Sequence, residues 1–437
     1  MTFSELNLSA PIISVLNKIG YTIPTPIQSK SIPYILQGKD IFGCAQTGTG
    51  KTAAFALPIL QLLSENEKLR NTKGIKALIL APTRELASQI SENITAYSAK
   101  LDIKHTVIFG GVSQHTQVNA LRNGVDILIA TPGRLLDLMQ QGIVKLNMIH
   151  YLVLDEADRM LDMGFARDLN KLISFMPAKR QNLMFSATFS NDIKKLAAGI
   201  LRDPVSVETA PQNATAQKVS HKVYQVDKGQ KTPLMIKLIK DNDWSQVLVF
   251  TRTKHGANKL TEKLIKAGIS AAAIHGNKSQ GARTKALKNF KDNSIKILVA
   301  TDIAARGLDI PLLPHVINFE LPNVPEDYVH RIGRTGRAGA EGEAISFVCS
   351  EETEYQKEIE KVLNEKLKTS ILDGFEPTDT APAKRAASQS KGSFGKKKGN
   401  TNTQGDKPKR KPHFKGNTTA GSTSGRGRTG APKKKRY

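Results

Sequence analysis

The sequence contains few cysteines, and their scarcity excludes two classes of site. Cys44 and Cys349 are the only two cysteines in 437 residues, too few for a disulfide framework or a cysteine-based zinc cluster. Each stands in an apolar segment that is typical of a strand. We therefore expect two buried thiols in a protein of a reducing compartment.

Long apolar runs are also lacking. No stretch approaches the roughly 18 apolar residues that a membrane-spanning helix requires. The first residues, MTFSELNLSAPIISVL, lack the basic segment, the uninterrupted apolar segment and the cleavage site of a secretory signal. We therefore expect a cytoplasmic protein with no membrane partner.

Acidic residues are scarce relative to basic ones. The chain has 39 Asp and Glu against 64 Lys and Arg, a formal net charge of +25. This balance excludes an acidic chaperone and favours a polyanionic partner such as nucleic acid. Residues 374–437 hold 17 of the basic residues and only three acids, in a composition of Gly, Ser, Thr, Asn, Pro and Lys with little to bury. This segment is predicted to be a disordered basic tail.

The remaining length suits two domains of roughly 150 residues each. Short runs rich in Val, Ile and Leu alternate with longer segments of helical spacing, the pattern of a parallel sheet covered on both faces. In the first half the expected strands are Ile41 to Cys44, Ala77 to Ala81, Thr106 to Phe109, Asp126 to Ala130, Tyr151 to Leu154 and Leu183 to Ser186. In the second half they are Lys222 to Val226, Val247 to Phe250, Ala271 to Ile274, Ile297 to Ala300, Val316 to Phe319 and Ala344 to Val348. The fold class is therefore α/β, with two tandem doubly wound parallel sheets.

Between these halves the periodicity stops at the polar segment ETAPQNATAQK, which is typical of a linker. We expect a first domain over residues 1–206, a linker over 207–217, a second domain over 218–373 and the tail over 374–437.

A glycine-rich octapeptide follows the first expected strand and precedes a helical segment. It reads Ala45-Gln46-Thr47-Gly48-Thr49-Gly50-Lys51-Thr52. Such a turn directs backbone N–H groups and a helix N-terminus at bound phosphate, while the lysine neutralises the β and γ oxygens and the hydroxyl of Thr52 holds Mg²⁺. The consensus begins with Gly where this chain has Ala45. The alternative is a Gly/Thr-rich loop without chemistry.

The expected strand Tyr151 to Leu154 ends at Asp155-Glu156-Ala157-Asp158. An acid at that position, beside a phosphate loop, can hold Mg²⁺ through water while its neighbour activates the attacking water. We assign these roles to Asp155 and Glu156. Taken alone, the four residues would equally suit a solvated turn or an acidic helix N-terminus.

These two motifs resemble those of the DEAD-box ATP-dependent RNA helicases, most closely the bacterial RhlE-type group. The resemblance extends over residues 3 to 350, with a dozen motifs in order. It implies two RecA-like domains, ATP and Mg²⁺ as cofactors, and RNA as the partner. The segment from Gly20 to Gln28 resembles the family's Q motif, with Phe3 as its upstream aromatic residue.

An amide offers both a donor and an acceptor, so Gln28 can read the edge of adenine while Tyr21 or Phe3 stacks on it. The alternative is that the aromatic residues belong to the core and Gln28 caps a helix.

The resemblance also implies residues that contact the RNA backbone and residues that couple nucleotide state to strand separation. The RNA contacts implied are Arg84, Gly111, Thr131, Arg134, Arg252 and Thr301. The coupling residues implied are Asp158, Ser186, Thr188 and His330. Arg84 and Arg134 could otherwise be surface arginines paired with nearby acids, and the hydroxyls could be helix caps.

The second domain carries a cluster of arginines from His330 to Arg337. Arg331, Arg334 and Arg337 fall within seven residues and would repel one another unless an anion lay among them. The resemblance implies that Arg334 and Arg337 are arginine fingers, which add 10³ to 10⁵ in rate in such enzymes, and that Asp309 contacts the ribose. The alternative is an ordinary basic helix.

These motifs predict an RNA helicase and RNA-stimulated ATPase that opens or remodels RNA locally. Backbone contacts carry no base readout, so recognition is expected to be largely independent of sequence. The tail offers a surface for ribosome-assembly or RNA-decay partners. Two rivals remain open: a DNA-directed helicase or translocase, and an RNA-annealing protein whose ATP site is vestigial.

Overall fold

The structure, a computed structural model, describes residues 1–45, 48–209, 219–305, 308, 310, 313–336 and 342–378. Four of the expected site residues, Gln46, Thr47, Asp309 and Arg337, lie outside the described residues. So do most of the expected linker and residues 379–437 of the expected tail.

The first domain is built on a parallel sheet. In the described part of the chain it has seven strands in the order β3-β4-β2-β5-β6-β1-β7. Their bounds are β1 Ile41–Cys44, β2 Ala77–Leu80, β3 His105–Ile108, β4 Ile127–Ala130, β5 Tyr151–Leu154, β6 Gln181–Ser186 and β7 Val205–Glu208. Since β1 pairs with both β6 and β7, the strand that precedes the phosphate loop is internal to the sheet.

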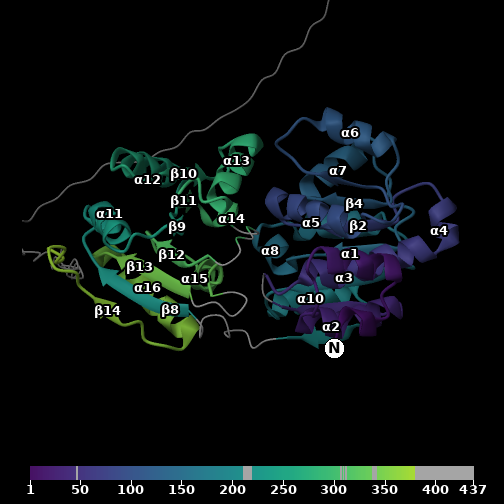
Figure 1. The fold of residues 1–437 in the computed structure, drawn as a ribbon, viewed down its shortest axis with the longest axis horizontal. Coiled ribbons are helices and arrows are strands. Elements are labelled where there is room, and N and C mark those ends of the chain that lie inside the picture. The colour runs from purple at the N-terminus through teal and green to yellow at the C-terminus, as the bar shows by residue number, and fades with distance from the viewer. Residues whose placement is uncertain are drawn as a thin grey trace, which may run out of the picture. The chain divides into compact units, whose positions relative to one another are not determined.

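Helices cover both faces of this sheet because successive side chains of a strand point to opposite sides. Ala77 and Ile79 of β2 belong to one core cluster, and Leu78 and Leu80 belong to the other. The first cluster includes residues of η1 Phe3–Leu6, α1 Ala10–Lys18, α2 Pro26–Leu36, α3 Lys51–Glu65, α4 Glu67–Asn71 and α5 Arg84–Tyr97. The second includes residues of α6 Gln114–Arg122, α7 Pro132–Gln140, α8 Ala157–Asp162, α9 Ala166–Ser174 and α10 Asn191–Ile200. All of these helices except η1 and α9 are labelled in Figure 1.

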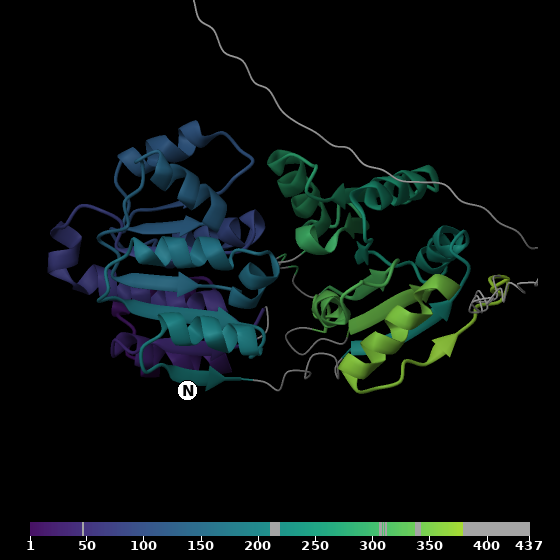
Figure 2. The same ribbon diagram turned by 180° about the vertical axis from the view of Figure 1, so that it is seen from behind.

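The second domain repeats the plan. Its sheet has, among the described residues, seven parallel strands in the order β10-β11-β9-β12-β13-β8-β14. Their bounds are β8 Val219–Gln225, β9 Val247–Phe250, β10 Ala271–Ile274, β11 Ile297–Ala300, β12 His315–Asn318, β13 Gly342–Val348 and β14 Thr369–Ser370. The helices are α11 Lys231–Asp241, α12 Lys254–Lys266, α13 Gln280–Lys291, α14 Asp302–Ala305, α15 Pro325–Ile332, η3 Ser350–Glu352 and α16 Thr353–Leu363. They lie against the two faces of the sheet (Figure 2).

The predicted fold class is confirmed: two doubly wound parallel α/β sheets follow one another along the chain. Both cysteines are buried and free, and burial raises the pKa of Cys44 to about 11. Among the described residues, no helix combines the length and the apolar character needed to cross a membrane.

Candidate functional site

The strand order divides the expected site residues of the first domain into two neighbouring groups. Strands β5, β6 and β1 are adjacent and end at Asp155, Ser186 and the phosphate loop. Strands β3, β4 and β2 are adjacent and lead into Gly111, Thr131 and Arg84. Because all strands are parallel, both groups lie along the carboxyl edge of the sheet, where α/β proteins bind ligands.

The phosphate loop ends at the first residue of α3. Gly48 and Gly50 have φ of 83° and 89°, in the left-handed region that glycine adopts without steric cost. Lys51 begins the helix, is 6% exposed, and its Nζ donates to the carbonyl of Ala45 at 2.8 Å. The lysine therefore folds back over the loop, with the helix N-terminus directed toward the same space.

Asp155 and Glu156 are both buried at the end of β5. Burial raises the pKa of Asp155 to about 7, against the opposing effect of the Lys51 ammonium. Glu156 is the N-cap of α8, and its φ of 53° places it in the left-handed region. This conformation costs a non-glycine residue free energy and is found often at functional sites. The Oδ1 atom of Asp155 accepts from the Glu156 N–H at 3.0 Å. The backbone thus holds both carboxyl groups at the strand end.

Asp158 connects this acidic segment to the segment that follows β6. Its Oδ2 accepts from the Ala187 N–H at 3.1 Å, and its Oδ1 accepts from the Arg159 N–H at 3.0 Å. The Ser186 hydroxyl accepts from the Thr188 N–H at 3.2 Å. The structure therefore brings together three of the four expected coupling residues, all in the first domain.

Gln28 joins the start of α2 to the phosphate loop. Its Oε1 accepts from the Thr25 N–H at 2.9 Å in a capping box, and its Nε2 donates to the Gly50 carbonyl at 3.1 Å. A Cβ added at Gly50 would overlap that amide. The capping alternative thus describes part of what Gln28 does, while the contact with Gly50 places the amide beside the loop.

The two candidate stacking rings differ in exposure. Phe3 is buried in the core of the first domain, as the core alternative anticipates. Tyr21 is 39% exposed, and its ring centroid lies 6.2 Å from that of Tyr97. Of the two rings, Tyr21 is therefore the one exposed to solvent.

The first-domain residues expected to contact RNA are close together. Gly111 has φ of 76°, and a Cβ added to it would overlap the Arg84 guanidinium. Arg134 donates from Nη2 to the Val112 carbonyl at 3.3 Å and lies 3.4 Å from Asp137. The ion-pair alternative therefore applies to Arg134, whereas Arg84 lies against the glycine turn that follows β3.

In the second domain, Arg331 has an internal anion. It is 2% exposed, and its Nε and Nη2 donate to the two carboxylate oxygens of Asp302 at 2.5 and 2.8 Å. Arg334 is also buried, and its Nη1 donates to the Leu308 carbonyl at 3.0 Å. The sequence predicted that these arginines need an anion. For Arg331 that anion is Asp302, at the start of α14, which the sequence analysis did not identify as a partner.

Arg252 is held by residues that the sequence did not single out. Its Nη2 lies 3.4 Å from Glu352 and its N–H donates to Glu320 at 2.8 Å. Glu352 is 1% exposed, forms an ion pair with the buried Lys231, and accepts from the Leu321 N–H at 3.1 Å. This network fixes the segments after β9, β12 and β13 around Arg252. No local pattern indicates it, since its bonded pairs are 31 to 121 residues apart in the chain.

Comparison with known proteins gives consistent matches along the chain. Residues 25–196 match the DEAD/DEAH box helicase family, and residues 230–339 match the helicase conserved C-terminal domain. The ATP-dependent RNA helicase CshA of Limosilactobacillus reuteri is 44% identical over 362 residues, which cover 83% of this chain and 72% of that protein. RhlB of Pseudomonas syringae pv. tomato is 42% identical over 84% of this chain and 93% of its own length.

Among solved structures, S. cerevisiae Dbp5 bound to RNA and ADP BeF3 superposes with a TM-score of 0.75 at 29% identity. The match covers 86% of this chain and 96% of that one. Mss116, a DEAD-box helicase bound to ssRNA and UDP-BeF, gives a TM-score of 0.77 at 30% identity over 85% of this chain and 79% of that one.

Proposed function

The chain belongs to the DEAD-box family of ATP-dependent RNA helicases, and on that premise we propose how its two RecA-like domains act on RNA. The protein couples ATP binding and hydrolysis to local unwinding or remodelling of RNA duplexes and RNA–protein complexes. The observation that carries this function is the division of one sheet edge. Lys51 follows β1, and Asp155 and Glu156 follow β5, with only β6 between these two strands, while Arg84, Gly111 and Thr131 follow the adjoining strands β2, β3 and β4. Nucleotide and RNA can therefore bind to the same rigid edge.

ATP is bound by the phosphate loop. The Lys51 ammonium leaves the Ala45 carbonyl and neutralises the β and γ oxygens, and the N–H groups at the start of α3 face the phosphates. Glu156 accepts a proton from the attacking water, for which its position beside Asp155 at the end of β5 is suited. Gln28 reads the adenine edge and Tyr21 stacks on the ring.

The residues at this edge fit a magnesium ion. Asp155 and the hydroxyl of Thr52 are hard oxygen ligands, and Mg²⁺ commonly takes one or two protein oxygens with waters and phosphates completing its shell. Burial disfavours the charged form of Asp155 and raises its pKa, and a bound cation would act against that shift by favouring the charged form. When bound, the ion neutralises charge that develops on the β and γ oxygens.

We assign arginine-finger roles to Arg334 and Arg337. In the arrangement described, the Arg334 guanidinium donates to the Leu308 carbonyl, so it has to exchange that bond for a γ-phosphate oxygen when the second domain completes the ATP site. RNA is held through its backbone by Arg84, Gly111, Thr131, Arg134, Arg252 and Thr301, which makes recognition largely independent of sequence.

Three finer assignments are also proposals. We place the protein in the RhlE-type group, although the relatives reported above bear other names. We place it in the cytoplasm, in agreement with two buried free thiols. We assign the basic segment after residue 378 to RNA and to ribosome-assembly or RNA-decay partners, on the strength of its charge.

Replacing Gln28 tests the adenine assignment. Gln28→Ala is expected to raise the ATP concentration needed for half-maximal hydrolysis about tenfold and to bring the ATP-to-GTP preference close to one, because the hydrogen bonds to the adenine edge are lost. Steady-state kinetics with both nucleotides at saturating RNA measure this.

Gln28→Glu is the matched control, since its carboxylate still accepts from the Thr25 N–H and preserves the capping box. It should lose the ATP preference as well, because the amide donor is gone. If both variants keep the wild-type preference for ATP over GTP in hydrolysis, Gln28 does not read adenine and acts only as a helix cap.

The proposed function itself is tested by comparing phosphate release stimulated by RNA and by DNA of the same sequence and length. Strong stimulation by RNA alone supports it, equal stimulation supports a DNA-directed translocase, and no hydrolysis supports an annealing protein with a vestigial site.

A further inference from the structure

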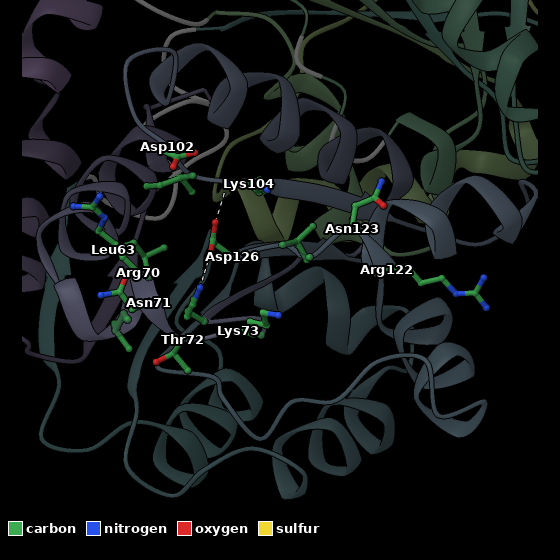
Figure 3. Close-up of a pocket in the computed structure, with 16 residues that line it drawn as sticks. Leu63, Arg70, Asn71, Thr72, Lys73, Asp102, Lys104, Arg122, Asn123 and Asp126 are labelled. Atoms are coloured by element: carbon green, nitrogen blue, oxygen red, sulfur yellow. Dashed lines mark hydrogen bonds and ion pairs between the residues drawn. The ribbon is translucent and has the colours of Figure 1, made fainter.

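A cavity lies in the first domain, at the amino edge of the sheet, opposite to the carboxyl edge that holds the site described above. It has a volume of about 480 Å³ and is lined by the segments that precede β2, β3 and β4, with Leu63 near the end of α3 (Figure 3). Strand β2, which has four residues, runs from the cavity to the carboxyl edge. A strand of that length spans about 13 Å, so the two edges are about that far apart. The cavity therefore belongs neither to the phosphate loop nor to the RNA-binding group.

The floor of this cavity is preformed. The ammonium of the buried Lys76 pairs with Asp126 at 2.5 Å, and the Lys104 N–H donates to the other carboxylate oxygen of Asp126 at 2.8 Å (Figure 3). The Lys76 and Ala77 N–H groups donate to the Asp126 carbonyl. These bonds join the three segments and neutralise the one acid on the floor.

The charge that remains is positive. Arg70, Lys73, Lys104 and Arg122 are exposed around the cavity, and Asp102 is the exposed acid among its lining residues. With the floor neutral, the lining keeps four basic residues and one acidic residue. Such an excess attracts anions, and guanidinium and ammonium groups suit phosphate oxygens.

The lining also offers neutral donors and close backbone approach. Asn71 and Asn123 present amide groups around the hollow (Figure 3), while the Thr72 hydroxyl donates to the Lys68 carbonyl at 2.7 Å. Gly124 has φ of 77°, which glycine adopts freely, and a Cβ added there would meet nothing within 4 Å, so its backbone is open to a ligand.

We propose that this cavity binds the diphosphate or triphosphate group of a small anion, either a free polyphosphate or a nucleotide. Its volume falls in the range of about 300–1,000 Å³ that is typical of small-molecule sites. Its net excess of three positive charges matches such a group. An RNA strand is a poorer fit, because the expected RNA contacts lie at the opposite edge. The inference does not depend on the helicase activity.

Lysine footprinting tests the proposal in the full-length protein. It measures the acylation of each lysine separately, so binding at the cavity is distinguished from binding at the phosphate loop or the tail. At physiological ionic strength, tripolyphosphate should protect Lys73 and Lys104 from acylation in a saturable manner. Lys263 and Lys266, exposed on α12, should stay reactive. GTP in a parallel titration distinguishes the two sources: protection at lower concentration than tripolyphosphate assigns a nucleotide, and equal or weaker protection assigns free polyphosphate.

A pair of variants controls for general charge. Arg70→Ala with Arg122→Ala removes two exposed cations from the cavity and should raise the tripolyphosphate concentration for half-protection of Lys73 about tenfold. Arg167→Ala with Arg202→Ala removes two exposed arginines elsewhere in the same domain and should leave it unchanged. Equal protection of the α12 lysines, an equal shift in both variants, or protection by single-stranded RNA but not by tripolyphosphate would overturn the proposal.

Discussion

Lys51→Ala is expected to reduce ATP hydrolysis by a factor of 10² to 10³ or more, the usual cost of removing one preorganised group that stabilises developing charge. Lys51 is buried at the start of α3 beside the loop, so water cannot replace its charge effectively. Its loss also raises the pKa of Asp155 further, since the lysine opposes the effect of burial there. Phosphate release at saturating RNA and ATP measures the effect.

RNA binding should survive this substitution, because Arg84, Gly111 and Thr131 follow other strands of the sheet. Lys39→Ala is the matched control: it removes an exposed lysine just before β1 and should hydrolyse ATP like the wild type. If Lys51→Ala retains RNA-stimulated hydrolysis near the wild-type rate, the loop does not bind the phosphates.

Glu156→Gln should keep ATP bound but slow hydrolysis by about 10² to 10⁴, the usual contribution of a general base. The amide has nearly the shape of the carboxylate and can occupy the same left-handed N-cap position, but it cannot accept the proton of the attacking water. In the mechanism that we propose, hydrolysis gates the grip on RNA, so the variant should remain on RNA with ATP far longer than the wild type. Single-turnover hydrolysis and the dissociation rate of labelled RNA measure the two effects.

Asp162→Asn is the control for Glu156→Gln. It removes an exposed carboxylate from the last residue of the same helix α8 and should change neither rate. Wild-type RNA release from Glu156→Gln in the presence of ATP would show that Glu156 is not the base.

Most strands could be predicted because a parallel strand buried on both faces is a short continuous apolar run. One misplacement occurs where polar residues are buried with dedicated partners. Strand β6 begins two residues early, at Gln181, because the Gln181 amide donates to the Ile35 and Lys39 carbonyls and Asn182 pairs with Asp40. Strand β8 begins at Val219, three residues before the predicted Lys222, because its first residues do not form an apolar run. The edge strands β7 and β14 were missed.

Those site residues could be predicted that directly follow a strand in the sequence. The phosphate loop and Asp155 each follow an apolar run directly, so their shared edge is a consequence of parallel strands. The partners of Arg331 and Arg252 could not be predicted in this way. Asp302 lies 29 residues from Arg331 and Glu352 lies 100 residues from Arg252, and only the three-dimensional fold selects these acids among the others.

The central claim is that one protein hydrolyses ATP in response to RNA and uses that hydrolysis to open duplexes. The most direct measurement follows phosphate release and the separation of a short labelled duplex in the same reaction, with RNA and with DNA of identical sequence. We expect RNA to stimulate phosphate release strongly and the RNA duplex to separate only with ATP, while the DNA duplex stays intact. Separation without nucleotide, or equal stimulation and opening with DNA, would contradict the account.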